Sequence, residues 1–133
     1  MGKAIAVTAV SLVTLVAIGY FLLLGVGKPI SSDLSVIGQG KPALVLAYVN
    51  YSPTGGDALG RLRTISSDYA SRLEFVVADM GTPPGLTFAN RHKLGDGQAI
   101  LMKQDGQPLE VINIPADEQA LRRLLDAKLA AVE

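Results

Sequence analysis

The sequence predicts an α/β domain with a central mixed sheet flanked by helices, preceded by a single transmembrane helix. Two near-continuous apolar runs of strand length, 43–49 and 74–80, alternate with stretches of helical periodicity. An Asp-Gly pair between two further apolar runs predicts an antiparallel hairpin. We therefore divide the chain into a membrane helix (1–27), a linker (28–40) and a soluble domain (41–133).

Residues 4–27 contain no charged side chain. A helix of that length spans about 36 Å, enough to cross a hydrocarbon core of about 30 Å. The run is longer than the roughly 7 to 15 apolar residues of a signal peptide, so we expect a retained anchor rather than a cleaved leader. Lys3 and Lys28 flank it and bias its orientation only weakly. We expect a single-pass protein of the cytoplasmic (inner) membrane, with the soluble domain on the periplasmic or extracytoplasmic side.

Small side chains along this run offer a surface on which a second helix could pack. They are Ala6, Thr8, Ser11 and Gly19. The alternative is ordinary transmembrane composition, since no Gly-xxx-Gly pair is present. The run holds no ionisable residue, so it gives no indication of a proton or ion pathway.

The soluble part begins with a polar stretch and a buried strand. Residues 28–40 (KPISSDLSVIGQG) read as a linker that packs locally through the short apolar stretch 34–37. Residues 43–49 (ALVLAYV) are apolar throughout, which is typical of a strand covered on both faces. A helix is predicted over 57–73, with Asp57 as its N-cap. Its expected core positions are Leu59, Leu62, Ile65 and Tyr69.

The second half continues the alternation. A second buried strand is predicted at 74–80, followed by a short proline-initiated helix in TPPGLTFANRHKL. In that helix we expect Leu86 and Ala89 to form a thin apolar face, with Phe88 on another side. The hairpin turns at Asp105-Gly106, and Asp117 caps a final helix at 118–131. The apolar stripe of this last helix is Leu121, Leu124, Leu125 and Leu129.

Over about residues 40–130 this order of elements resembles the thioredoxins. The stretch KPALVLAYVNYSPTGGD is similar to the thioredoxin segment that enters on Lys-Pro, runs along a buried strand and turns at the active site. The stretch QAILMKQDGQPLEVI resembles the antiparallel hairpin of the family. The resemblance implies a thioredoxin-like fold.

The same resemblance places the redox machinery of thioredoxins on residues that cannot perform it. Trp-Cys-Gly-Pro-Cys of the family corresponds to Tyr51-Ser52-Pro53-Thr54-Gly55, so the cysteine positions fall on Ser52 and Gly55. Leu46 stands where thioredoxins keep a buried aspartate, and Gln98 stands where they keep the cis-proline that faces the active site. We therefore expect a degenerate, redox-inactive member of this fold.

Composition excludes several other classes of function. The chain has no cysteine, which excludes thiolate nucleophiles, thiolate zinc sites and disulfides. His92 is the single histidine, so one chain cannot build a histidine cluster for a metal. Twelve basic and twelve acidic side chains give no electrostatic indication of nucleic-acid binding. We expect no cofactor, although a carboxylate pair such as Asp79 and Asp96 is conceivable, with strand-end and turn roles as the alternative.

Three functions remain open. We expect a non-catalytic, membrane-anchored accessory subunit of a larger integral membrane protein complex, of the kind found in electron-transport assemblies. The first alternative is a membrane-tethered assembly factor or chaperone for a cytochrome or metal-centre complex. The second is an anion or small-molecule binder that uses the amides of the turn from Ser52 to Asp57. Ser52 has no base in view, because His92 is expected on a different helix, so a hydrolase is not favoured.

Overall fold

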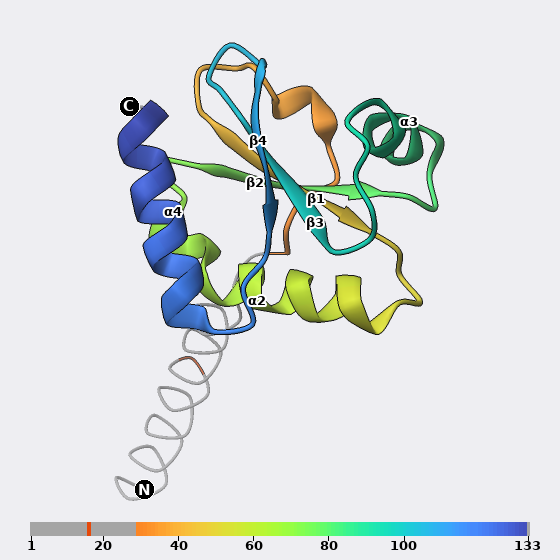
Figure 1. Cartoon of the computed structure of the whole chain (residues 1–133), viewed down its shortest axis with the longest axis horizontal. Coiled ribbons are helices and arrows are strands. Elements are labelled where there is room, and N and C mark those ends of the chain that lie inside the picture. Colours follow the sequence, from red (N-terminus) through yellow and green to blue (C-terminus); the bar gives the residue numbers. More distant parts are fainter. Residues whose placement is uncertain (1–15, 17–28, 133) are drawn as a thin grey trace, which may run out of the picture.

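The structure is a computed structural model that describes Val16 and residues 29–132. Its elements follow one another in the predicted order (Figure 1). They are η1 (Leu34–Val36), β1 (Ala43–Tyr48), α2 (Pro53–Tyr69), β2 (Glu74–Asp79), α3 (Pro83–Arg91), β3 (Gln98–Met102), β4 (Pro108–Asn113) and α4 (Glu118–Val132).

The four strands form one mixed sheet in the order β2-β1-β3-β4. Strand β1 pairs in parallel with β2, where Leu46 lies opposite Val77, and antiparallel with β3, where Leu46 lies opposite Ala99. Strands β3 and β4 form the antiparallel hairpin. The predicted mixed sheet is therefore confirmed, with β1 and β3 in its centre.

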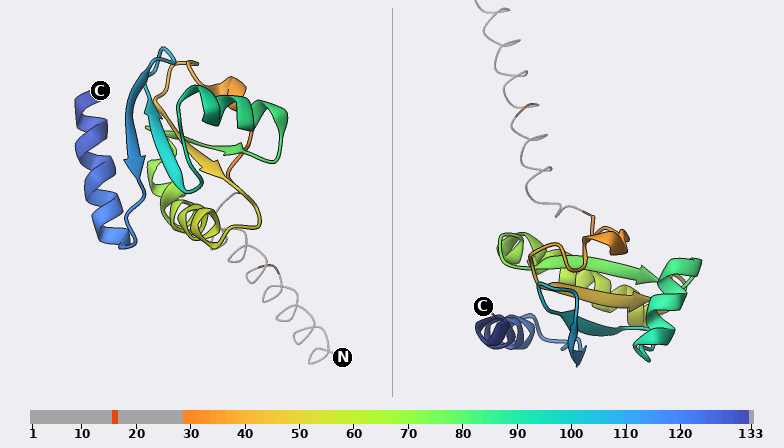
Figure 2. Two further views of the ribbon diagram at one scale, coloured as in Figure 1. Left: turned by 45° about the vertical axis from the view of Figure 1, so that its right-hand side comes forward. Right: turned by 90° about the horizontal axis from the view of Figure 1, so that it is seen from above.

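Helices cover both faces of the sheet (Figure 2). Helices α2 and α4 pack on one face, and α3 with η1 packs on the other. Alternate residues of β1 contribute to the two cores: Leu44 and Leu46 face α2 and α4, whereas Val45 and Ala47 face α3 and η1. All four are fully buried, which explains why this strand is apolar at every position.

Helix α2 begins at Pro53, four residues before the start predicted from Asp57. Proline suits the first helical position because it has no amide hydrogen to satisfy there. Ser52 precedes it in an extended conformation, and its side chain makes no capping hydrogen bond. Asp57 lies inside the helix, so the predicted N-cap was wrong. The predicted core positions Leu59, Leu62, Ile65 and Tyr69 are all buried.

Helix α3 presents a different face from the predicted one. Phe88 and Ala89 are buried, whereas Leu86 remains 42% exposed. The reason is the close packing of Gly85 on β2. A Cβ at this position would lie 2.0 Å from the carbonyl oxygen of Asp79. Residues 85, 88 and 89 share one side of a helix, so the glycine fixes the buried face.

The hairpin and the last helix follow the sequence closely. Gly106 has a φ of 87° and ends a short connection in which its amide donates to the carbonyl of Lys103. In α4 the Asp117 side chain accepts a hydrogen bond from the amide of Ala120, which confirms the predicted cap. Leu121, Leu125 and Leu129 are buried, and Leu124 packs partly buried beside them.

The segment predicted as a linker is fastened to the sheet. Ser31 forms a parallel bridge with Val76, and its carbonyl accepts a hydrogen bond of 2.9 Å from the amide of Val77. It therefore lies along the edge of β2 that β1 leaves open. Further on, Leu34 and Val36 of η1 and the following Ile37 pack on the α3 face. No helix within residues 29–132 is long and apolar enough to span a bilayer. Apart from Val16, the predicted membrane helix lies outside the described residues, as do Ala6, Thr8, Ser11 and Gly19.

Candidate functional site

The turn between β1 and α2 is short and internally hydrogen-bonded. The amide of Ser52 donates to the carbonyl of Val49 at 3.0 Å, and the carbonyl of Ser52 accepts the amide of Gly56 at 3.1 Å. Tyr51 projects from the turn and is 87% exposed. The two glycines of NYSPTGGD lie within the first turn of α2 rather than in the loop.

Asp96 closes this turn from the loop before β3. One carboxylate oxygen accepts the amide of Val49 at 2.8 Å, and the other accepts the amide of Gly55 at 3.1 Å. The carboxylate thus joins the end of β1 to the first turn of α2. A negative charge is favourable there because the helix start carries a partial positive charge and unpaired amides.

The glycine at position 55 is required by this contact. Gly55 is buried, and a Cβ at that position would lie 2.1 Å from Oδ1 of Asp96. Gly97 makes a similar close approach, because it has a φ of +84° and a Cβ there would lie 2.9 Å from Cγ2 of Thr54. The loop 95–97 therefore packs directly on the residues that the resemblance assigns to the redox motif.

Sequence reasoning singled out Asp96 only as one half of a carboxylate pair with Asp79. In the structure, Asp79 accepts the amide of Gly81 at 2.9 Å, while Asp96 serves Val49 and Gly55. The two carboxylates thus have separate partners. Within residues 29–132, no group of three or more histidine and carboxylate side chains could hold a metal ion. The signal for the role of Asp96 was the Gly-Asp-Gly sequence, since flanking glycines permit a close backbone approach.

Gln98, which the resemblance assigns to the position of the cis-proline of thioredoxins, is the first residue of β3. Its side chain accepts the amide of Gly95 at 2.9 Å and donates to the side chain of Asn113 at 3.2 Å. Residues 29–132 contain no cis peptide bond. Gln98 thus fixes the loop that carries Asp96.

The remaining candidates do not join this site. Leu46 is fully buried in the core beneath α2 and α4. His92 follows α3 on the opposite face of the sheet, where its ring centroid lies 4.5 Å from that of Phe88. Burial, and secondly the charge of Arg91, lower the pKa of His92 below its usual value. The structure does not bring Ser52 together with a general base.

We compared the chain with known proteins at the levels of sequence and structure. No family model matches the sequence, and no curated protein matches it. Among solved structures, the thioredoxin Deadhead of Drosophila melanogaster aligns with a TM-score of 0.56 and 14% identity, over 68% of this chain and 83% of that chain. Mitochondrial thioredoxin 3 of Saccharomyces cerevisiae aligns with a TM-score of 0.56 and 19% identity, over 70% and 84%. A Fasciola hepatica thioredoxin aligns with a TM-score of 0.56 and 13% identity, over 68% and 83%.

At these identities the likeness concerns the fold and not the activity. It agrees with the resemblance found in the sequence. The chain contains no cysteine, so it has no thiol with which to carry out the exchange reactions of thioredoxins. Residues 29–132 therefore adopt a thioredoxin-like fold, and the sequence resemblance assigns its two cysteine positions to Ser52 and Gly55.

Proposed function

We propose that this protein is a non-catalytic, membrane-anchored accessory subunit that uses its thioredoxin-like domain as a docking module on an integral membrane protein complex. The observation that carries the proposal is the closed turn at the start of α2. The backbone of the turn is kept, but Asp96 occupies the space that a side chain at position 55 would need. A surface retained without its reactive groups is suited to protein contact.

The attachment of the chain to the edge of β2 supports a position of the domain close to the bilayer. Only residues 28–30 separate the end of the predicted membrane helix at Gly27 from Ser31, which is bonded to β2. Four peptide units extend at most about 14 Å, whereas a free linker over 28–40 would reach about 45 Å. The domain would therefore stay near the membrane surface, where a membrane complex could bind it.

The closed turn also bears on the anion-binder alternative. The amide of Gly55 is already engaged by Asp96, and the amide of Gly56 by the carbonyl of Ser52. Pro53 has no amide hydrogen to offer. An external anion at this helix start would have to compete with a carboxylate of the chain itself, so we favour the docking role.

The proposal is tested by purifying the tagged full-length chain from its native membranes in mild detergent, followed by native electrophoresis and mass spectrometry. We expect an integral membrane complex to accompany it at a fixed ratio. Recovery of the chain alone would contradict the proposal, and substoichiometric association would favour the assembly-factor alternative.

A structural variant sharpens this test. Six Gly and Ser residues inserted between Lys28 and Pro29 would lengthen the reach of the domain without touching the bridge at Ser31. We expect less co-purification of the complex. The matched control carries the same insertion after Ala116, an exposed residue between β4 and α4, and should retain the complex. Equal recovery from both variants would argue against a role for the short tether.

A further inference from the structure

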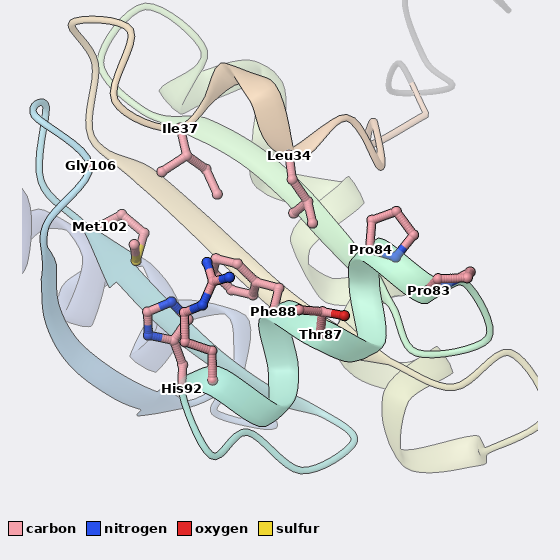
Figure 3. Close-up of a pocket in the computed structure, with 10 residues that line it drawn as sticks. Leu34, Ile37, Pro83, Pro84, Thr87, Phe88, His92, Met102 and Gly106 are labelled. Carbon is pink, nitrogen blue, oxygen red and sulfur yellow. The ribbon is translucent and has the colours of Figure 1, made fainter.

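A hollow that the sequence did not predict lies on the opposite face of the sheet from the α2 turn. It is a cleft of about 630 Å³ between η1, α3 and the β3–β4 hairpin (Figure 3). This volume falls within the range of small-molecule sites. The cleft is separate from the residues of the thioredoxin motif.

The walls of the cleft are mostly apolar. Leu34 of η1 and Ile37, which follows η1, approach from one side, while Phe88 of α3 and Met102 of β3 lie across from them (Figure 3). Phe88 and Met102 belong to the buried core, with 7% and 3% exposure, so core side chains form the base of the cleft. Leu34 and Ile37 are only half-buried and leave apolar surface available to a ligand.

One permanent charge lines the cleft. Arg91, in the last turn of α3, is exposed and forms no ion pair with a carboxylate of residues 29–132. The carboxylates adjoining the lining residues are engaged in their own turns: Asp33 accepts from Ser35, and Asp105 accepts from Gln107. His92 lies beside Arg91, with its ring against Phe88.

We propose that this cleft binds an aliphatic carboxylate, with the alkyl chain between η1 and α3 and the carboxylate at Arg91. An apolar channel with a single unpaired guanidinium matches a ligand that has an apolar body and one anionic end. A neutral apolar ligand would leave the guanidinium without a partner, and a small anion would leave the apolar walls uncovered.

The chain contains a built-in probe for this site. It has three methionines, Met1, Met80 and Met102, which can be labelled with ¹³C at the methyl group. Met102 lines the cleft, whereas Met80 packs on the same core without lining it. In NMR titrations of the full-length chain in zwitterionic nanodiscs, we expect octanoate to shift the Met102 methyl signal saturably and to leave the Met80 signal in place.

Chain length and charge distinguish the two parts of the proposed site. Affinity should rise about fourfold for each methylene from hexanoate to octanoate, while acetate should give no shift. Octanol should bind more weakly than octanoate. Arg91→Gln should weaken octanoate about fivefold and leave octanol unchanged. Arg63→Gln, on the exposed side of α2, is the charge-matched control and should bind octanoate normally.

Several results would overturn the proposal. Parallel, non-saturating shifts of Met80 and Met102 would indicate partition into the lipid and the core. Equal affinity for octanol and octanoate, or no effect of Arg91→Gln, would mean that Arg91 serves only the end of its helix. A pocket-blocking variant, Thr87→Trp, changes an exposed lining residue without touching the core and should abolish the Met102 shift. Persistence of the shift in that variant would place the ligand elsewhere.

Discussion

The two faces of the sheet differ in whether their charged and polar groups have partners within the described part of the chain. At the start of α2, the carboxylate of Asp96 satisfies two backbone amides, and a glycine makes room for it. On the α3 side, the cleft is apolar and open, and its one permanent charge, Arg91, has no carboxylate partner in the part of the chain described. The turn that the resemblance equates with the active site of thioredoxins is thus internally satisfied, while the apolar cleft and its unpaired charge lie on the other face of the sheet.

The difference shows how the start of a helix is satisfied within a chain that has no cysteine. The start of a helix presents unpaired amides and a partial positive charge, which a redox site uses for its thiolate. Without the thiols, those amides still need a partner. Asp96 supplies one from within the chain, and in doing so it closes the site.

The largest effect on the free energy of unfolding is expected on the cleft side, where Gly85 of α3 packs directly on the backbone of β2. In Gly85→Ala, the new Cβ would lie 2.0 Å from the carbonyl oxygen of Asp79, a backbone atom that cannot turn away. We expect a loss of more than about 3 kcal/mol in the free energy of unfolding. Urea unfolding of the full chain in detergent, followed by far-UV circular dichroism, measures it.

Gly60 provides the matched control for that substitution. It lies in α2, and a Cβ at its position would meet nothing within 4 Å. Gly60→Ala should therefore stabilise the protein by about 0.5 to 1 kcal/mol, since alanine favours a helix over glycine. Similar losses in both variants would mean that the contact at Gly85 relaxes and does not fix α3.

At the turn closed by Asp96, substitutions should cost less free energy of unfolding, and the effects at positions 96 and 55 should depend on each other. Asp96→Ala removes a charged acceptor from two amides and should cost about 2 kcal/mol. Gly55→Ala alone should cost a similar amount, because the added methyl meets the carboxylate. The double variant should cost clearly less than the sum, since the clash disappears with the carboxylate. Additive losses would show that the methyl and the carboxylate do not compete for one space.

The sequence predicted most of the fold, and it did so where one pattern determined the outcome. Strand β1 is apolar at each position because both of its faces are covered, and Asp105-Gly106 determines the hairpin. The start of α2 was misplaced because Asp57 looks like a cap, whereas the structure uses Pro53 and the carboxylate of Asp96. That contact joins positions about forty residues apart, which local patterns do not encode.

The sequence likewise predicted only a part of the candidate site. The resemblance located Ser52, Gly55 and Gln98 in one region, and the structure places the loop before Gln98 against Thr54. The face of α3 was misjudged because Gly85 carries no hydrophobic signal, although its contact with Asp79 orients the helix. The cleft at Arg91 could not be anticipated from periodicity, since it is formed by a segment predicted to be a linker.

A gain in stability is expected at the end of the cleft helix. Lys93 follows α3 with a φ of 56°, in the left-handed region that favours glycine. Lys93→Gly should stabilise the protein by about 0.5 to 1 kcal/mol in the same urea experiment. Gly106 has a φ of 87° in the hairpin, and Gly106→Ala should lose a comparable amount. A loss on Lys93→Gly would show that the lysine side chain contributes more than its backbone strain costs.

The smallest expected effect on the free energy of unfolding comes from the titration of His92, which borders the cleft. Burial and the charge of Arg91 lower its pKa in the folded state, so the unfolded chain binds a proton more readily. The free energy of unfolding should therefore decrease as the pH falls through the pKa of an unfolded histidine, near 6.5, and this decrease should stop below the lower folded value. The chain has a single histidine, so one ¹H NMR titration gives that folded value without assignment.

In His92→Gln, this part of the pH dependence should disappear, while the contribution of the carboxylates at lower pH should remain. The comparison bears on the contrast between the two sides of the sheet, because the lowered pKa of His92 arises first from burial and secondly from the charge of Arg91. A titration midpoint at or above 6.5 would mean that the imidazole is solvated or paired with a carboxylate. Burial at the end of α3 and the charge of Arg91 would then not dominate the surroundings of this histidine.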